Sequence, residues 1–168
     1  MKKIAILILV PGLLIACGGT SDEAAYEAAE PAAEAVLLKV EAPPALDVPE
    51  PEEVTGEDDW EAKAHNKNIE VVQVINIIQP IAAYITAGFE QYGSSFSETL
   101  HEEWGDTQVQ LTQATTLYGS CQERMASGEF DKQLFLDLEE VWQGLVKTGV
   151  AGVRTKQMVD SELARLKG

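Results

Sequence analysis

Glu98 and His101 stand three positions apart, a spacing that can place a carboxylate and an imidazole on one face of a helix. Di-iron bundles use this Glu-x-x-His pattern, but they need two copies of it together with further inward-facing glutamates. This chain has one copy, and its other histidine, His65, follows Glu61 at a spacing of four. We therefore expect a solvated helix face and no cofactor, with a haem or metal redox site as the alternative.

Cys121 is the candidate nucleophile, because a thiol becomes reactive when its pKa is lowered beside a base such as His101. The cysteine lies on an apolar helical stripe, however, which is the position of a small core residue. The sequence contains no phosphate-binding loop, Ser-His-Asp arrangement or zinc pattern. We predict that the chain is not an enzyme and that Cys121 packs in the core.

Four aromatic residues are candidates for an interaction or ligand site. Trp60, Trp104 and Trp142 could line a cavity, and Tyr118 stands on the same apolar stripe as Trp104. Large aromatic side chains also dominate the packing of protein cores. The simpler expectation is therefore packing in the core or at its rim.

Three long segments with helical spacing must position these residues. They cover about residues 58–92, a second stretch that begins at Ser95, and a third that follows Gly128 and reaches Leu166. Apolar residues recur in steps of three and four, which is the spacing of one buried helix face. The stripes are Val71, Ile75, Ile78, Ala82, Ile85, Phe89 and Tyr92; Phe96, Leu100, Trp104, Thr107, Leu111, Ala114, Tyr118, Cys121 and Met125; and Leu134, Leu138, Val141, Leu145, Thr148, Gly152, Val159, Leu163 and Leu166. Residues 60–168 are predicted to form an all-α domain, an antiparallel bundle of about three long helices.

Local signals refine this expectation. Ser95 and Glu98 match a capping box, in which each side chain satisfies the other's free backbone amide. Pro80 should kink the first helix, because it lacks a backbone donor. The third stripe is interrupted by Gly144, Gly149 and Gly152. Either that helix breaks near Thr148 or a neighbour packs against the bare backbone, and we favour one continuous or kinked helix.

Residues 71–89 contain no charged side chain, so a membrane span is an alternative to a buried helix for this segment. Gln73, Asn76 and Gln79 interrupt the segment, and such polar groups are costly in lipid. No basic flank marks a cytoplasmic side. We expect a buried helix.

The first sixteen residues have the features of a signal peptide. Two lysines precede an apolar run over residues 4–16, which is shorter than the ~20 residues of a membrane-spanning helix. The run ends in Leu14-Ile15-Ala16-Cys17. This ending resembles the lipobox of bacterial lipoproteins.

The resemblance implies an anchor at Cys17. In that family the thiol is joined to diacylglycerol, a peptidase cuts before the cysteine, and lipid fastens the protein to its membrane. Gly18 stands where lipoproteins retained at the inner membrane have aspartate. The implied location is therefore the cell envelope, with the outer membrane favoured.

The chain is strongly acidic, with 12 Lys and Arg residues against 28 Asp and Glu residues and a formal net charge of −16. Such acidity argues against a nucleic-acid partner, because phosphates require a basic face. Residues 17–59 hold five of the seven prolines and a single basic residue, Lys39. We predict a disordered acidic tether there, in which the apolar island at residues 36–40 is either a short helix or a docking segment.

These features predict an envelope lipoprotein in three parts: a signal peptide over residues 1–16, a lipidated tether over 17–59 and a helical domain over 60–168. The helical domain is expected to be a protein-binding or structural module that contacts another protein, with self-association along its apolar seams as the expected mode. A different expectation is a carrier that holds an apolar ligand between the helices, around Pro80 and the glycine cluster.

Overall fold

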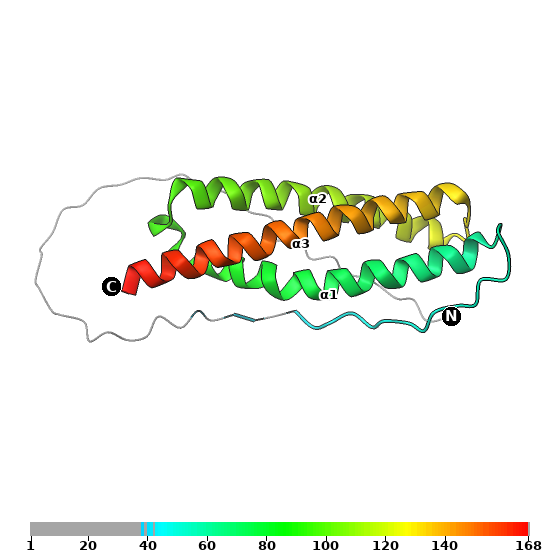
Figure 1. The fold of residues 1–168 in the computed structure, drawn as a ribbon, viewed down its shortest axis with the longest axis horizontal. Helices are drawn as coiled ribbons and strands as arrows, with labels where there is room; N and C mark the ends of the chain where they lie inside the picture. The colour runs from blue at the N-terminus through cyan, green and yellow to red at the C-terminus, as the bar shows by residue number, and fades with distance from the viewer. Residues whose placement is uncertain (1–37, 39, 42, 168) are drawn as a thin grey trace, which may run out of the picture. The chain divides into compact units, whose positions relative to one another are not determined.

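The computed structural model describes residues 38, 40–41 and 43–167, and this part of the chain contains three long helices (Figure 1). Helix α1 spans Trp60–Tyr92, α2 spans Glu98–Ala126 and α3 spans Lys132–Lys167, with a short 3-10 helix, η1, at Gly93–Ser95. Helix α2 runs back along α1, and α3 runs in the direction of α1. The described residues include no strand. The prediction of an all-α bundle of three long helices is confirmed.

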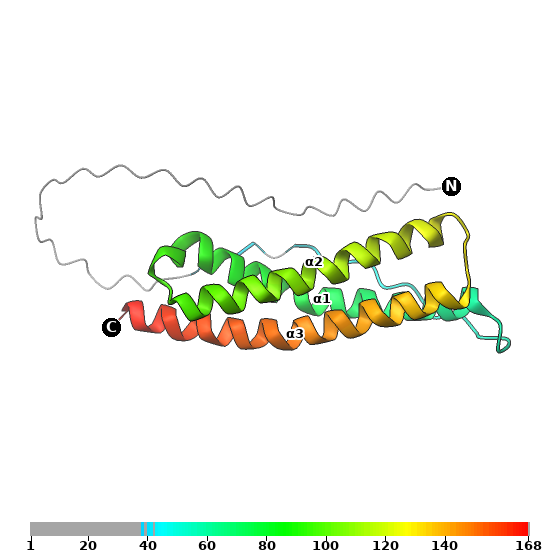
Figure 2. The ribbon, with the colours of Figure 1, turned by 90° about the horizontal axis from the view of Figure 1, so that it is seen from above.

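Helix α3 is the central element of the bundle. It packs against both α1 and α2. Figure 1 shows α3 running between these two helices, and Figure 2 shows α3 along one side of the bundle. The buried residues of α3 repeat at steps of three and four from Leu134 to Leu163, so one continuous face serves both neighbours. This position makes α3 the helix on which the core depends most.

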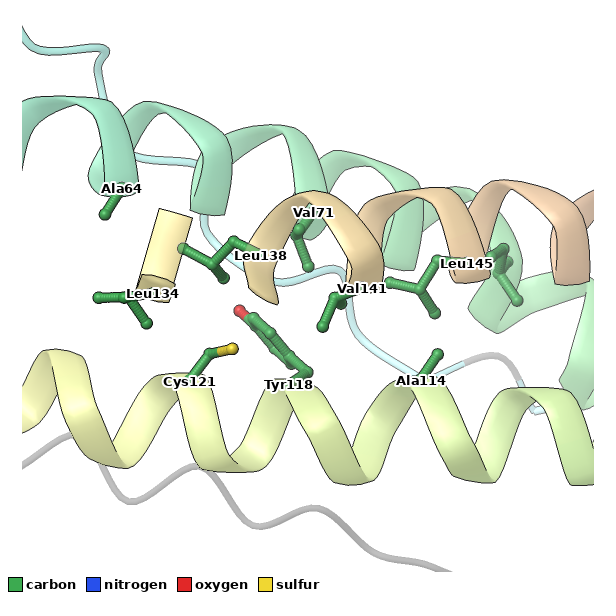
Figure 3. Close-up of a cluster of buried hydrophobic side chains, with 10 residues drawn as sticks. Ala64, Val71, Ala114, Tyr118, Cys121, Leu134, Leu138, Val141 and Leu145 are labelled. Atoms are coloured by element: carbon green, nitrogen blue, oxygen red, sulfur yellow. The ribbon is translucent and has the colours of Figure 1, made fainter. Parts of the chain in front are cut away.

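The core divides into two clusters of buried apolar side chains. The first gathers large residues of α3 against Val71 of α1 and Tyr118 of α2 (Figure 3). The second lies toward the other end of the bundle, where Ile85, Trp104 and Val159 meet. Most members belong to the stripes that the sequence indicated. The additional buried α3 residue is Thr155.

Three buried threonines occupy the stretch between the two clusters. The hydroxyl groups of Thr107, Thr148 and Thr155 each donate a hydrogen bond to the carbonyl oxygen four residues earlier, at 2.8–3.0 Å. These bonds stay within one helix, so the threonines bury their hydroxyls without needing a partner helix.

Gly149 and Gly152 of α3 mark a close approach of α1 rather than a break, whereas Gly144 faces Ala114 of α2. Helix α3 is continuous through all of them. A Cβ atom on Gly149 would lie 3.3 Å from Cγ1 of Ile78, and one on Gly152 would lie 3.5 Å from Cγ2 of Ile81. The isoleucine side chains therefore fill the space that the glycines leave.

The predicted capping box at Ser95 and Glu98 is wrong. Ser95 belongs to η1, and the N-cap of α2 is Ser97, whose side chain makes no capping hydrogen bond. The cause is Phe96, which adopts an extended conformation and is 7% exposed in the second cluster. Its ring meets that of Phe89 edge to face at 5.2 Å. Burying Phe96 moves the start of α2 two residues along the chain.

Helix α1 continues through Pro80 and is long and apolar enough to cross a membrane, judged by length and composition alone. The core helix of a soluble bundle meets the same criterion. Val71, Ile78 and Ile85 are at most 6% exposed, within the two clusters. Three residues of its predicted stripe are thus buried against the other helices, and the remaining four, Ile75, Ala82, Phe89 and Tyr92, are partly buried beside them.

Part of the predicted tether, just before α1, makes hydrogen bonds to the helical domain. Residues 43–55, which we call the strap, lie extended beside α1 (Figure 1). Asn76 hydrogen-bonds the backbone of Leu46, and Asn66 hydrogen-bonds the backbone of Glu52. Leu38, in the apolar island, packs against the second cluster, which favours the docking alternative. Residues 1–37, which include the signal peptide and Cys17, and residues 39 and 42 lie outside the described residues.

Candidate interaction surface

The structure does not bring the three tryptophans together. The Trp60 ring lies 6.1 Å from that of Phe135, near the starts of α1 and α3. Trp142 is half-buried at the first cluster. Trp104 is 7% exposed and belongs to the second cluster. Each packs in the core or at its rim, and the three lie at separate places in the described bundle.

Two open hollows mark the surface, and no tryptophan lines either of them. One, of about 380 Å³, is lined by α3 residues between Arg154 and Arg165. The other, of about 190 Å³, lies between α2 and α3 and includes Gln110, Glu140 and Lys147. Both are shallow and bordered by charged groups. Neither offers the enclosed apolar lining that a carrier of an apolar ligand needs.

Tyr118 is a core residue that joins α2 to α1. Its side chain is 5% exposed, and its hydroxyl donates a hydrogen bond to Oδ1 of Asn68 at 2.9 Å. Nε2 of Gln122 donates to the same oxygen at 2.7 Å. Burial raises the pKa of Tyr118 to about 12. The residue thus braces α2 against α1, two helices that each pack mainly on α3.

The raised pKa of Tyr118 predicts a loss of stability in alkali. The folded protein holds this proton more tightly than the unfolded chain, so the contribution is complete below pH 10 and is lost as pH rises from 10 toward 12. We expect the free energy of unfolding to fall by roughly 2 kcal/mol over that interval. Urea unfolding followed by circular dichroism measures this change.

Tyr84 provides the matched control, because its pKa is also raised to about 12, through its hydrogen bond to Asp160 on the surface. Tyr118→Phe should flatten the alkaline fall more than Tyr84→Phe, since Tyr118 is the more deeply buried of the two. An equal slope in wild type and Tyr118→Phe would contradict the assignment.

Cys121 lies in the first cluster beside Tyr118 and is 1% exposed (Figure 3). Burial raises the pKa of its thiol to about 11, which leaves the thiol protonated at neutral pH. His101 stands twenty residues away on the same helix, about 30 Å along its axis. The two residues therefore form no nucleophile–base pair.

The histidines lie at opposite ends of the bundle. Nε2 of His101 is 2.8 Å from the carbonyl oxygen of Gly93, and the ring of His65 packs against Phe130 at 5.1 Å. Within the residues that the structure describes, no three His, Cys, Asp or Glu side chains gather closely enough to hold a metal ion. Glu98 and His101 thus have no metal-ligating neighbours among these residues.

Four exposed apolar side chains lie along the contact between α1 and α3, and we call them the outer patch. They are Ile77 at 64% exposure, Val146 at 37%, Val150 at 70% and Val153 at 45%. Gly149 of α3 faces Ile78 of α1. At about 100° per residue, the three valines lie within about 100° of Gly149, on the side away from the core. Ile77 lies about 100° from Ile78, also on the outer side.

The outer patch stands in a region with few charges. Residues 71–89 of α1 have none, and residues 141–153 of α3 have one, Lys147. Lys147 lines the hollow between α2 and α3 and stands three positions before Val150, at the border of the patch. Sequence reasoning missed this surface, although the steps of four and three between Val146, Val150 and Val153 form a second apolar stripe. This second stripe indicates an exposed patch only when it is known which side of α3 faces α1.

No family model matches the chain, and no curated protein or solved structure is significantly similar to it. The site is therefore interpreted from its own geometry. That geometry combines a buried apolar core, two shallow hollows and the exposed outer patch.

Proposed function

We propose that the chain is a lipid-anchored protein of the bacterial cell envelope whose helical domain binds protein, and that its partner is a second copy of itself. The lipobox-like ending at Cys17 supports the anchor. The outer patch supports the binding role, and it is the observation that carries the proposal. Exposed apolar side chains gathered on one face are typical of protein contact sites.

The charge of the chain favours the outer patch as the contact. Two copies with a formal charge of −16 each repel one another over most of their surfaces. They can approach most closely where charges are sparse, which is along residues 71–89 and 141–153. A two-fold axis through Val150 would set the patch of one copy against the same patch of the other, as in most homodimers.

This proposal predicts that Val150→Asp prevents self-association. A carboxylate at the centre of the apolar contact would be buried without a partner and would add like-charge repulsion. Size-exclusion chromatography with light scattering, on the mature chain carrying Cys17→Ser, should give a dimer for the parent and a monomer for Val150→Asp.

Val109 offers the matched control, because it is an exposed valine, 57% accessible, on α2 and outside the patch. Val109→Asp adds the same charge and should leave the dimer intact. A parent that stays monomeric at every concentration, or equal effects of the two substitutions, would contradict the proposal.

A further inference from the structure

The strap is held on α1 by two asparagine side chains that each bind one residue of extended main chain. The backbone N–H of Leu46 donates to Oδ1 of Asn76 at 2.7 Å, and Nδ2 of Asn76 donates to the Leu46 carbonyl at 2.9 Å. The backbone N–H of Glu52 donates to Oδ1 of Asn66 at 2.7 Å, and Nδ2 of Asn66 donates to the Glu52 carbonyl at 2.8 Å. We call Asn66 and Asn76 the asparagine clamp.

The spacing of the two clamped residues fits an extended chain. Leu46 and Glu52 are six positions apart. In an extended chain, residues an even number of positions apart point their backbone N–H and C=O groups toward the same side. The clamped positions avoid the prolines, which lack the N–H that the clamp binds. Prolines at positions 43, 44, 49 and 51 also restrict the free segment toward extended conformations. The segment therefore loses little conformational freedom on binding.

The clamp recognises main chain and makes little use of side chains. Among residues 43–55, Leu46 alone is partly buried and the others are exposed. On α1, Ile69 is 8% exposed, although it lies about 180° around the helix from Ile78, which faces α3. This surface thus fits an extended peptide whose main chain is bound at two residues six positions apart. The first of the two bound residues is aliphatic, as Leu46 is in the strap.

We propose that the asparagine clamp is a binding site for an extended peptide, and that copies of this chain exchange their straps through it. A strap from a second copy offers the same N–H and C=O groups and the same leucine, so the contacts are identical in cis and in trans. The strap joins α1 through Gly56, around which there is open space, and an exposed turn. Opening this turn costs the hydrogen bonds from Thr55 to Asp59, from the Asp59 N–H to the Gly56 carbonyl and from Lys63 to the Glu57 carbonyl, and breaks no helix.

Exchange uses a different surface from the outer patch, so the two proposals can fail separately. Both invoke a second copy, but the exchange does not rest on the proposed function. Every chain in the test therefore carries Val150→Asp to remove association through the patch, and Cys17→Ser to keep the protein in solution.

The test mixes two chains: a donor whose clamp is disabled but whose strap is intact, and an acceptor whose strap is disabled but whose clamp is intact. The donor chain carries Asn66→Ala and Asn76→Ala, which remove the clamp and keep the strap. The acceptor chain carries Leu46→Asp and Glu52→Pro, which disable the strap and keep the clamp. We expect the mixture to form a one-to-one heterodimer in native mass spectrometry, with one partner isotope-labelled, while each chain alone stays monomeric.

Two further acceptors decide the result. An acceptor that also lacks Asn66 and Asn76 should lose the heterodimer, whereas one that carries Gln108→Ala, at an exposed amide on α2, should keep it. All chains are first checked for parental helicity by circular dichroism. Absence of the heterodimer with folded chains, or equal heterodimer with the clampless acceptor, would overturn the proposal.

Discussion

Replacing Cys17 by serine is expected to move the protein from the membrane fraction to the soluble fraction of the cell envelope. The resemblance to a lipobox implies diacylglycerol on this thiol, as proposed above, and each buried CH₂ contributes about 0.8 kcal/mol to membrane binding. Two or three acyl chains hold a protein almost permanently, whereas a serine hydroxyl in this motif receives none. Fractionation of native cells, together with incorporation of labelled palmitate, measures both the location and the modification.

The second cysteine supplies the control for that experiment. Cys121 is 1% exposed inside the first cluster, so Cys121→Ser should leave labelling and membrane location unchanged. A Cys17→Ser protein that stays in the membrane fraction after an alkaline wash would contradict the lipid anchor. That result would favour a membrane span in α1, whose residues 71–89 carry no charge.

The helices could be predicted from the sequence because large apolar residues repeat over many turns. The α3 stripe stays aligned for three turns over four residues that are at most 1% exposed: Leu134, Leu138, Val141 and Leu145. A strand would place these residues on both of its faces. The repeated spacing therefore leaves few alternatives to a helix with one buried face.

The strap could not be predicted from composition because its attachment uses main-chain atoms. Its prolines and acidic residues are typical of disorder, and its side chains are exposed apart from Leu46. The partners that hold it, Asn66 and Asn76, are two polar residues ten positions apart on α1. A backbone contact of this kind leaves no apolar periodicity in either segment, so only the folded arrangement reveals it.

The outer patch and the start of α2 were missed for a related reason. Single valines beside a buried stripe indicate nothing until the neighbouring helix is placed, and Gly149 places it. At the start of α2, the local preference of Ser95 for a cap competes with burial of Phe96. Burying an aromatic ring contributes more than one capping hydrogen bond, so the tertiary contact decides the helix boundary.

Leu138→Ala is expected to cost about 2–5 kcal/mol of folding free energy, the range for truncating a fully buried leucine. Leu138 is 0% exposed and belongs to the first cluster on α3, the helix that packs against both α1 and α2. The cavity would therefore weaken both helix contacts together. Because domains are stable by only about 5–15 kcal/mol, urea unfolding followed by circular dichroism should show a much lower midpoint.

Leu136 makes the comparison specific to burial. It stands two positions away on the same helix and is 42% exposed, so Leu136→Ala removes the same atoms without opening an internal cavity. Alanine is also at least as favourable as leucine in a helix, and we expect a change within about 0.5 kcal/mol. Equal losses for the two substitutions would mean that Leu138 is not enclosed by α1 and α2. The central position of α3 in the bundle would then be wrong.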